Sequence, residues 1–210
     1  HLGCTKETCS NANGLIVKPS VTSLRYNNVS NFFFASRSME QTGNSFGFVS
    51  SEVDTHMSKN NEWGAVAYLT QSIYGRCTSS TNCPQIGINN NSSFLTGYGA
   101  PAGSSSSTRM GTYNTILGKN ASTTGNIYGI YDMSGGTTEY VMGVYNNTKG
   151  SYSGFSSLPD SKYYNLYTDD SSYTGHALSE TKNWYSNHAN FVDTSFPWFI
   201  RGGFYNNGTY

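Results

Sequence analysis

The stretch Gly125–Met142, which reads GNIYGIYDMSGGTTEYVM, joins a turn, a short apolar run, a glycine pair and two carboxylates. Gly125-Asn126 is a turn signal. The apolar run Ile127–Met133 predicts a buried strand or a buried turn. Gly135-Gly136 breaks that run, because glycine permits a positive φ angle and close approach of the backbone. A second extended segment is predicted to begin at Glu139, so the stretch reads as two chain segments joined at the glycines.

Two carboxylates, Asp132 and Glu139, flank the glycine pair. Together with the carbonyl groups of the turn they can converge on one point, and calcium takes oxygen ligands of this kind. A second interpretation stays equally open. In it, Asp132 caps the turn and Glu139 pairs with an arginine such as Arg201.

Composition narrows the class of protein. The chain has 210 residues, enough for one domain with a sizeable core. Charged residues make up 11%, whereas there are 17 tyrosines and 23 glycines. Disordered chains are highly charged and poor in aromatic residues, so this composition instead predicts a loop-rich surface protein that uses Tyr and Asn for contacts.

The charge balance and the hydropathy of the chain argue against a nucleic-acid partner and against a membrane-spanning segment. The 12 basic and 12 acidic residues cancel, and no basic cluster stands out, so we expect no nucleic-acid partner. No run reaches the roughly 18 apolar residues that cross a bilayer, so we expect no membrane span. The chain has no initiator Met and no signal peptide, and it stops at Tyr210 within an element, so we expect it to be trimmed at both ends.

Four cysteines form two close pairs, Cys4/Cys9 and Cys77/Cys83. Neither spacing is that of a zinc ribbon, so two local disulfides are predicted, in an oxidising extracellular setting. Four reduced thiols in a cytosolic protein are the weaker alternative, and pairing between the two pairs stays open.

Two helices are predicted by apolar residues recurring at helical spacing. The first spans Val29–Glu40, with candidate caps in Tyr26-Asn27-Asn28. The second spans Glu62–Ile73, with Asn60 or Asn61 as its cap. Outside these helices and the stretch Gly125–Met142, the chain is predicted to be mostly loop, apart from a short strand at 15–17, a short helix at 178–187 and an apolar run at 196–200. The apolar faces are Val29, Phe32, Phe33, Ser36 and Met39 in the first helix, and Trp63, Val66, Ala67, Leu69, Thr70 and Ile73 in the second.

The segment Gly129–Tyr140 resembles the G-x-Y-D-M-x-G-N-x-W-E-W signature of formylglycine-generating (sulfatase-modifying factor) domains. Gly136, Thr138 and Tyr140 depart from it, standing where the family has Asn, Trp and Trp. Two further segments carry the resemblance. Trp63–Leu69 is similar to the W-x-D-A-x-A-Y helix of that family.

The third segment, Phe199–Gly203, is similar to the family's V-x-R-G-G-S-W strand. Its continuation, Arg201–Gly208, also resembles the variable region of proteins diversified by diversity-generating retroelements. The resemblance implies an α+β, C-type-lectin-like fold with two helices, short irregular strands and long loops. The domain is expected to span 25–210 and to be incomplete at its C-terminus, preceded by a disulfide-bearing arm at 1–24.

The resemblance also bears on chemistry. It implies a calcium ion held by the side chains of Asp132 and Glu139 and by the carbonyl groups of Gly135 and Thr137. In the enzymes, a thiol pair follows the R-G-G strand. The corresponding position here is about Asn207, and no Cys follows it. Asn cannot form a thiolate, so we expect no catalysis.

The function expected from these observations is ligand binding or adhesion by an extracellular or cell-surface domain of bacterial origin. The partner would be a protein or a carbohydrate. Two alternatives remain: a structural subunit that self-assembles into a pilus-like filament, and a formylglycine-generating-type oxidoreductase whose cysteines lie beyond residue 210. The recognition residues expected at the end of the chain are Phe204, Tyr205, Asn206, Asn207 and Tyr210.

Overall fold

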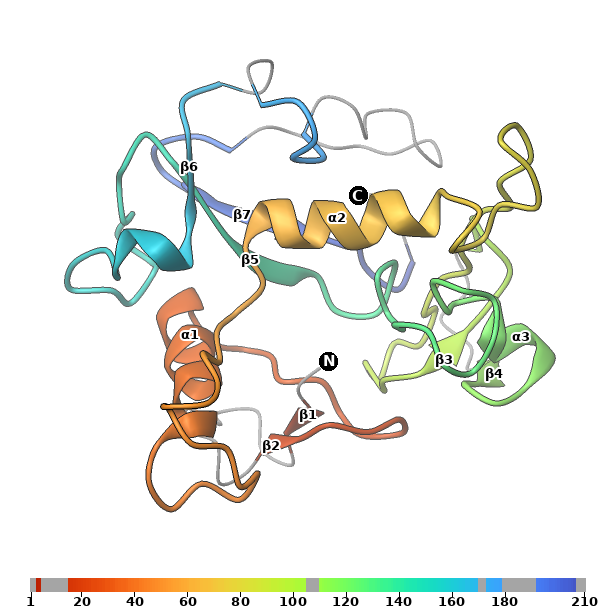
Figure 1. Cartoon of the computed structure of the whole chain (residues 1–210), viewed down its shortest axis with the longest axis horizontal. Helices are drawn as coiled ribbons and strands as arrows, with labels where there is room; N and C mark the ends of the chain where they lie inside the picture. The colour runs from red at the N-terminus through yellow and green to blue at the C-terminus, as the bar shows by residue number, and fades with distance from the viewer. Residues whose placement is uncertain (1–2, 5–14, 105–109, 170–172, 179–191, 207–210) are drawn as a thin grey trace.

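The computed structural model describes residues 3–4, 15–104, 110–169, 173–178 and 192–206. The described part mixes helices with small sheets, which confirms the predicted α+β class (Figure 1). In chain order the elements are β1 (Gly3–Cys4), β2 (Leu15–Ile16), α1 (Val29–Arg37), the 3-10 turn η2 (Ser38–Glu40), α2 (Asn60–Thr70), β3 (Tyr98–Gly99), β4 (Gly111–Thr112), α3 (Ile116–Lys119), β5 (Glu139–Tyr145), the 3-10 turn η3 (Ser161–Tyr163), β6 (Asn165–Tyr167) and β7 (Trp198–Arg201).

The strand β5 is the centre of a three-stranded sheet with the order β6-β5-β7. It begins at Glu139, as predicted, and pairs antiparallel with β7 through Glu139 opposite Arg201. On its other side it pairs parallel with β6, which lies in a segment predicted to be loop. The helix α2 crosses in front of β5 and β7 in Figure 1. Two-stranded pairs, β1-β2 and β3-β4, complete the sheets of the described residues.

The first helix forms where it was predicted. Asn28 is its cap, since the Asn28 side chain accepts a hydrogen bond of 3.0 Å from the backbone N–H of Asn31. The helix turns into η2 and stops before Gly43, whose φ angle is +82°. Of its three phenylalanines, Phe33 is buried in the core and Phe34 is half exposed.

The second helix starts earlier than predicted, and its buried face differs. Lys59, not Asn60 or Asn61, is the cap, because the Glu62 carboxylate accepts a 2.8 Å hydrogen bond from the backbone N–H of Lys59. Small side chains and Asn60 form the buried face, whereas Leu69 is 57% exposed. The buried residues of α2 are Asn60, Gly64, Ala67 and Thr70.

Close packing against its neighbours explains that face of α2. A Cβ atom at Gly64 would lie 3.0 Å from the Cβ of Ala177. A Cβ atom at Gly143 in β5 would lie 3.1 Å from the Cβ of Asn60. Both contacts are tighter than ordinary packing, so a side chain at Gly64 or Gly143 would force its neighbours to shift.

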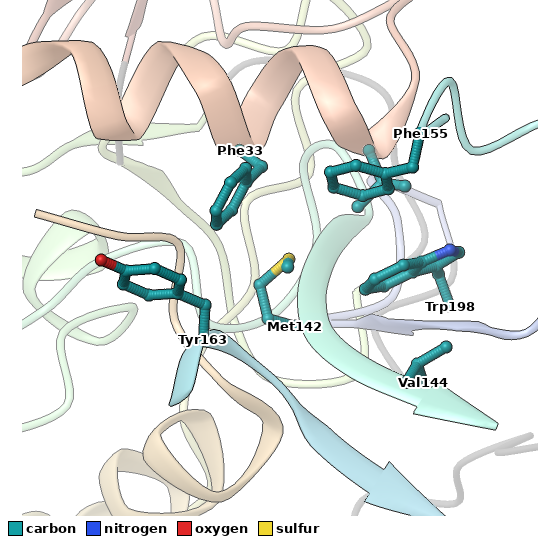
Figure 2. Close-up of a cluster of buried hydrophobic side chains, with 7 residues drawn as sticks. Phe33, Met142, Val144, Phe155, Tyr163 and Trp198 are labelled. Atoms are coloured by element: carbon teal, nitrogen blue, oxygen red, sulfur yellow. The ribbon is translucent and has the colours of Figure 1, made fainter. Parts of the chain in front are cut away.

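The main core lies between α1 and the sheet. Figure 2 shows Phe33 pointing from α1 toward Met142 and Tyr163. The Phe33 ring meets those of Tyr163 and Phe155 edge-on at 5.6 and 5.7 Å between centroids. Edge-to-face pairs of this kind add to the free energy gained by burial. The buried members of this cluster are Val29, Phe33, Met142, Val144, Phe155, Tyr163 and Trp198.

The prediction that the apolar run Ile127–Met133 is buried is wrong, because none of its apolar residues is fully buried. Ile130 is half exposed and Tyr128 is 88% exposed, in a turn that precedes β5. Asn126 starts that turn, because its side chain accepts a 2.8 Å hydrogen bond from the backbone N–H of Tyr128. A polar turn holds this segment at the surface. The predicted helix at 178–187 lies almost wholly outside the described residues.

Candidate functional site

Asp132, the first of the two predicted carboxylate ligands, is 3% exposed. Its Oδ1 accepts a hydrogen bond of 3.0 Å from Asn89 Nδ2, and its Oδ2 accepts one of 2.9 Å from the backbone N–H of Gly97. Its φ angle is +64°, in the left-handed region that Asp tolerates better than most residues. Asp132 therefore ties the glycine turn to the loop at 89–97.

The other three predicted ligands lie along the same turn. The backbone N–H of Gly135 donates a 2.6 Å hydrogen bond to the carbonyl of Gly202. Gly202 also lies so close to Glu139 that a Cβ atom there would be 2.6 Å from Glu139 Oε2. Thr137 Oγ1 is buried and has no hydrogen-bond partner among the described residues. The glycine turn therefore packs against the end of β7.

Both interpretations of the two carboxylates stay predictions. Both carboxylate oxygens of Asp132 accept hydrogen bonds from N–H groups. Glu139 is paired with Arg201 in the backbone register of the β5 and β7 strands. In the described ranges, no three His, Cys, Asp or Glu side chains group as metal ligands do. Calcium ligation, which would also use carbonyl groups, stays a prediction.

A buried polar network lies beside this turn, and the sequence analysis missed it. Asn60 is fully buried, and its Oδ1 accepts hydrogen bonds of 2.8 and 2.6 Å from Nε and Nη2 of Arg201. Its Nδ2 donates to the Tyr167 hydroxyl and to the His176 carbonyl. Asn60 thereby links α2 to β7 and β6. The sequence signal was the Asn-Asn pair before Glu62, which we assigned to capping.

The two histidines among the described residues, His56 and His176, each contact neighbouring polar groups. His176 Nδ1 lies 2.8 Å from the Tyr167 hydroxyl. His56 Nδ1 lies 2.7 Å from the carbonyl of Asp54, and its Nε2 faces Glu62 at 3.4 Å. Each ring therefore belongs to a local network.

The expected recognition segment is described only in part. Phe204 and Tyr205 are half-buried and Asn206 is exposed, while Asn207 and Tyr210 lie outside the described residues. The backbone N–H of Tyr205 donates a 2.9 Å hydrogen bond to the carbonyl of Gly136, which anchors the segment to the glycine turn. The Tyr205 ring meets the Phe94 ring edge-on at 5.7 Å.

Beside Tyr205 lies a group that the sequence did not reveal. The Arg25 guanidinium lies 4.7 Å from the centroid of the Tyr26 ring and 4.6 Å from that of Phe94. Both aromatic residues have left-handed backbones, with φ angles of +55° and +54°. We call Arg25, Tyr26, Phe94 and Tyr205 the arginine–aromatic surface. Because Phe94 is far from Arg25 in the chain, only the folded structure brings them together.

A left-handed backbone costs a bulky residue on the order of 1–3 kcal/mol, and such residues cluster at functional sites. Tyr26 is also 73% exposed, so burial of its ring does not offset that cost. Arg25 sits between the two rings in the geometry of a cation–π contact. The arrangement places a half-buried arginine against an exposed tyrosine at the surface.

The disulfide Cys77–Cys83 forms as predicted. Cys9 lies outside the described residues, so the Cys4–Cys9 pair stays a prediction. Among the helices described, none is long and apolar enough to span a membrane. Compared with known proteins, the chain matches no family model, no curated protein and no solved structure.

Proposed function

We propose that this chain is a non-catalytic binding domain of an extracellular or cell-surface protein, with the arginine–aromatic surface as its recognition site. The observation that carries the proposal is the pair of left-handed aromatic residues, Tyr26 and Phe94, that hold Arg25 beside Tyr205. Tyr26 is mostly exposed, so packing of its ring does not offset the cost of its left-handed backbone.

The chemistry of the surface suits recognition. Tyr and Arg are the residue types most enriched at the energetic centres of interfaces. A tyrosine supplies contact area at low entropic cost, and Asn206 adds an adaptable hydrogen-bonding side chain nearby in the chain. The Cys77–Cys83 disulfide supports an oxidising, extracellular setting.

The test uses two probes, a printed glycan array and a phage-displayed random peptide library, because carbohydrate and protein partners are both expected. We expect the wild type to select binders from one of them. Tyr26→Ala should weaken those binders about tenfold, equivalent to ~1.4 kcal/mol. The matched control is Tyr74→Ala, which removes another tyrosine, 81% exposed, on the turn after α2.

Equal binding by wild type and Tyr26→Ala would refute this recognition surface. If Tyr74→Ala weakened binding as much as Tyr26→Ala, the interaction would be nonspecific adhesion of tyrosines. Selection of no binder from either probe would count against the binding function itself.

A further inference from the structure

Two aromatic rings, those of Tyr152 and Phe196, lie together at the surface. Tyr152 follows β5 and Phe196 precedes β7, and because these strands are antiparallel both residues lie at the same end of the sheet. The side chains are 76% and 66% exposed, and their rings are stacked, with centroids 6.0 Å apart and 11° between the planes. Single exposed apolar side chains are common on proteins, but two parallel rings from separate segments form a shared surface. We call Tyr152 and Phe196 the aromatic pair.

The loop that carries Tyr152 is bonded to the core on both sides of that residue. Before it, the carbonyl of Lys149 accepts a 2.9 Å hydrogen bond from Trp198 Nε1. After it, the carbonyl of Ser153 accepts a 3.0 Å hydrogen bond from the backbone N–H of Ser30 in α1. The backbone beneath the tyrosine is therefore placed by two core elements.

The turn that carries Phe196 is also held by hydrogen bonds, and it meets the first loop. The Asp193 carboxylate accepts hydrogen bonds of 2.7 and 3.0 Å from the backbone N–H groups of Ser195 and Phe196. A Cβ atom at Gly150 would lie 2.7 Å from Cδ of Pro197, so the two segments pack closely beside the rings. Because the backbone beneath both rings is fixed before a ligand arrives, the entropic cost of binding is lowered.

The neighbours of the two rings in the chain are polar and carry no net charge. Three of them are exposed hydroxyl residues, Ser151, Thr194 and Ser195. Two more, Lys149 and Asp193, are exposed and contribute one charge of each sign. An apolar surface bordered by hydroxyl groups suits a neutral ligand that is apolar on its faces and hydroxylated at its rim.

A pyranose sugar with equatorial hydroxyl groups has this form, since its C–H groups point above and below the ring. The face of an aromatic ring is the negative part of its quadrupole, so it attracts such C–H groups. Proline-rich peptides, which also bind aromatic side chains, dock in grooves lined by them. The aromatic pair offers the outward faces of two rings that are stacked on each other, which favours a sugar over such a peptide.

We propose that the aromatic pair binds neutral oligosaccharides of equatorial pyranoses, the class of β-linked glucose and N-acetylglucosamine. A sugar ring would lie flat on the outward face of Phe196 or Tyr152, with its rim hydroxyls toward the polar residues beside the rings. The site is separate from the arginine–aromatic surface, because the aromatic pair precedes β7 whereas Tyr205 follows that strand.

NMR titration of the isotope-labelled chain tests the proposal with two probes, cellotetraose and chitotetraose. We expect wild type to bind at least one of them, with shift changes at the aromatic pair. Tyr152→Ala and Phe196→Ala should each weaken that binding severalfold. Tyr152→Phe keeps the ring and should bind as wild type does. Tyr74→Ala is the matched control, since it removes a tyrosine that is 81% exposed on another turn and should leave binding unchanged.

Circular dichroism melting of every variant shows that it folds, which we expect because the substituted rings are exposed. The proposal fails if neither oligosaccharide binds, if both alanine variants of the pair bind as wild type does, or if Tyr74→Ala weakens binding as much as they do. Binding of decaproline in place of the sugars would assign the pair to proline-rich peptides and overturn the proposal. Sugar binding that Tyr26→Ala removes and Phe196→Ala leaves intact would place the sugar at the arginine–aromatic surface instead.

Discussion

At the scale of single residues, the Asn60 side chain joins α2 to β6 and β7 of the sheet. The Asn60 amide bonds a buried guanidinium, a buried hydroxyl and a backbone carbonyl at once. Taking a partner from a buried charge costs more than losing an exposed hydrogen bond, because the charge stays desolvated. The stability of the fold therefore depends strongly on one amide.

We predict that Asn60→Ala lowers the free energy of unfolding by about 3 kcal/mol, since two N–H groups of Arg201 lose their acceptor. Urea unfolding measures this difference. Asn61→Ala is the control, because Asn61 Oδ1 is buried without a hydrogen-bond partner among the described residues, and its loss should cost under ~1 kcal/mol. Equal losses in the two variants would contradict the assigned role of Asn60.

A second prediction concerns Asp132. Asp132→Ala leaves Asn89 Nδ2 and the Gly97 N–H without their acceptor, so we expect a loss of about 2–4 kcal/mol. If Asp132 only holds the turn, this loss is the same in calcium and in chelator. Thermal melting of wild type, Asp132→Ala and Glu139→Ala under both conditions measures it.

A bound calcium ion would give a different result. A ligand specific for the folded state adds ~2.7 kcal/mol at a hundredfold excess over its dissociation constant. A melting temperature that calcium raises in wild type but not in Glu139→Ala would establish the ion site and overturn the turn-holding interpretation.

At the scale of elements, helical periodicity predicted both long helices and the glycine pair placed the start of β5, whereas β6 was not predicted. The helix α1 was predictable because Asn28 and the phenylalanine spacing agree on it. The start of α2 was not, because its cap depends on a bond from Lys59 to Glu62 rather than on a short polar side chain. With three residues, β6 shows no periodicity of its own and forms only because β5 lies beside it.

The loop before α2 joins α1 to η3 through one carboxylate. Asp54 accepts hydrogen bonds from Lys162 Nζ at 3.1 Å, from the Tyr163 hydroxyl at 3.0 Å and from Arg37 Nη1 at 2.5 Å. The hydrogen bond from Lys162, with those from Tyr163 and Arg37, lowers the pKa of Asp54 from its ordinary 3.8 to about 2.

Because the pKa of Asp54 is lower in the folded state, its contribution to stability is present above pH 3.8 and is lost as the pH falls toward about 2. We predict that Asp54→Asn removes part of the acid-induced loss of stability between these values, which urea unfolding at successive pH values measures. The control is Glu52→Gln, an exposed carboxylate of the same loop, which should keep the wild-type slope. An unchanged slope in Asp54→Asn would contradict the prediction.

At the scale of the whole molecule, the family resemblance led to the α+β class and the cysteine spacing led to one disulfide, and both are present in the structure. They did not reveal the arginine–aromatic surface or the aromatic pair. The surface requires Phe94 to meet Arg25, and the pair requires the loop after β5 to meet the turn before β7. Contacts of this kind depend on how segments that are distant in the chain pack together. Sequence patterns report only on residues that are close together in the chain.

The bond between Asn60 and Arg201 joins residues 141 positions apart, and the central strand takes a partner from the last described element. A chain emerging from the ribosome therefore cannot close this sheet until the segment that carries β7 has been made. Domains built on such distant pairings fold in about milliseconds to seconds, since the chain must close long loops before any contact repays it. We therefore expect slow folding of this sheet, and the growing chain depends on protection from aggregation until β7 has been made.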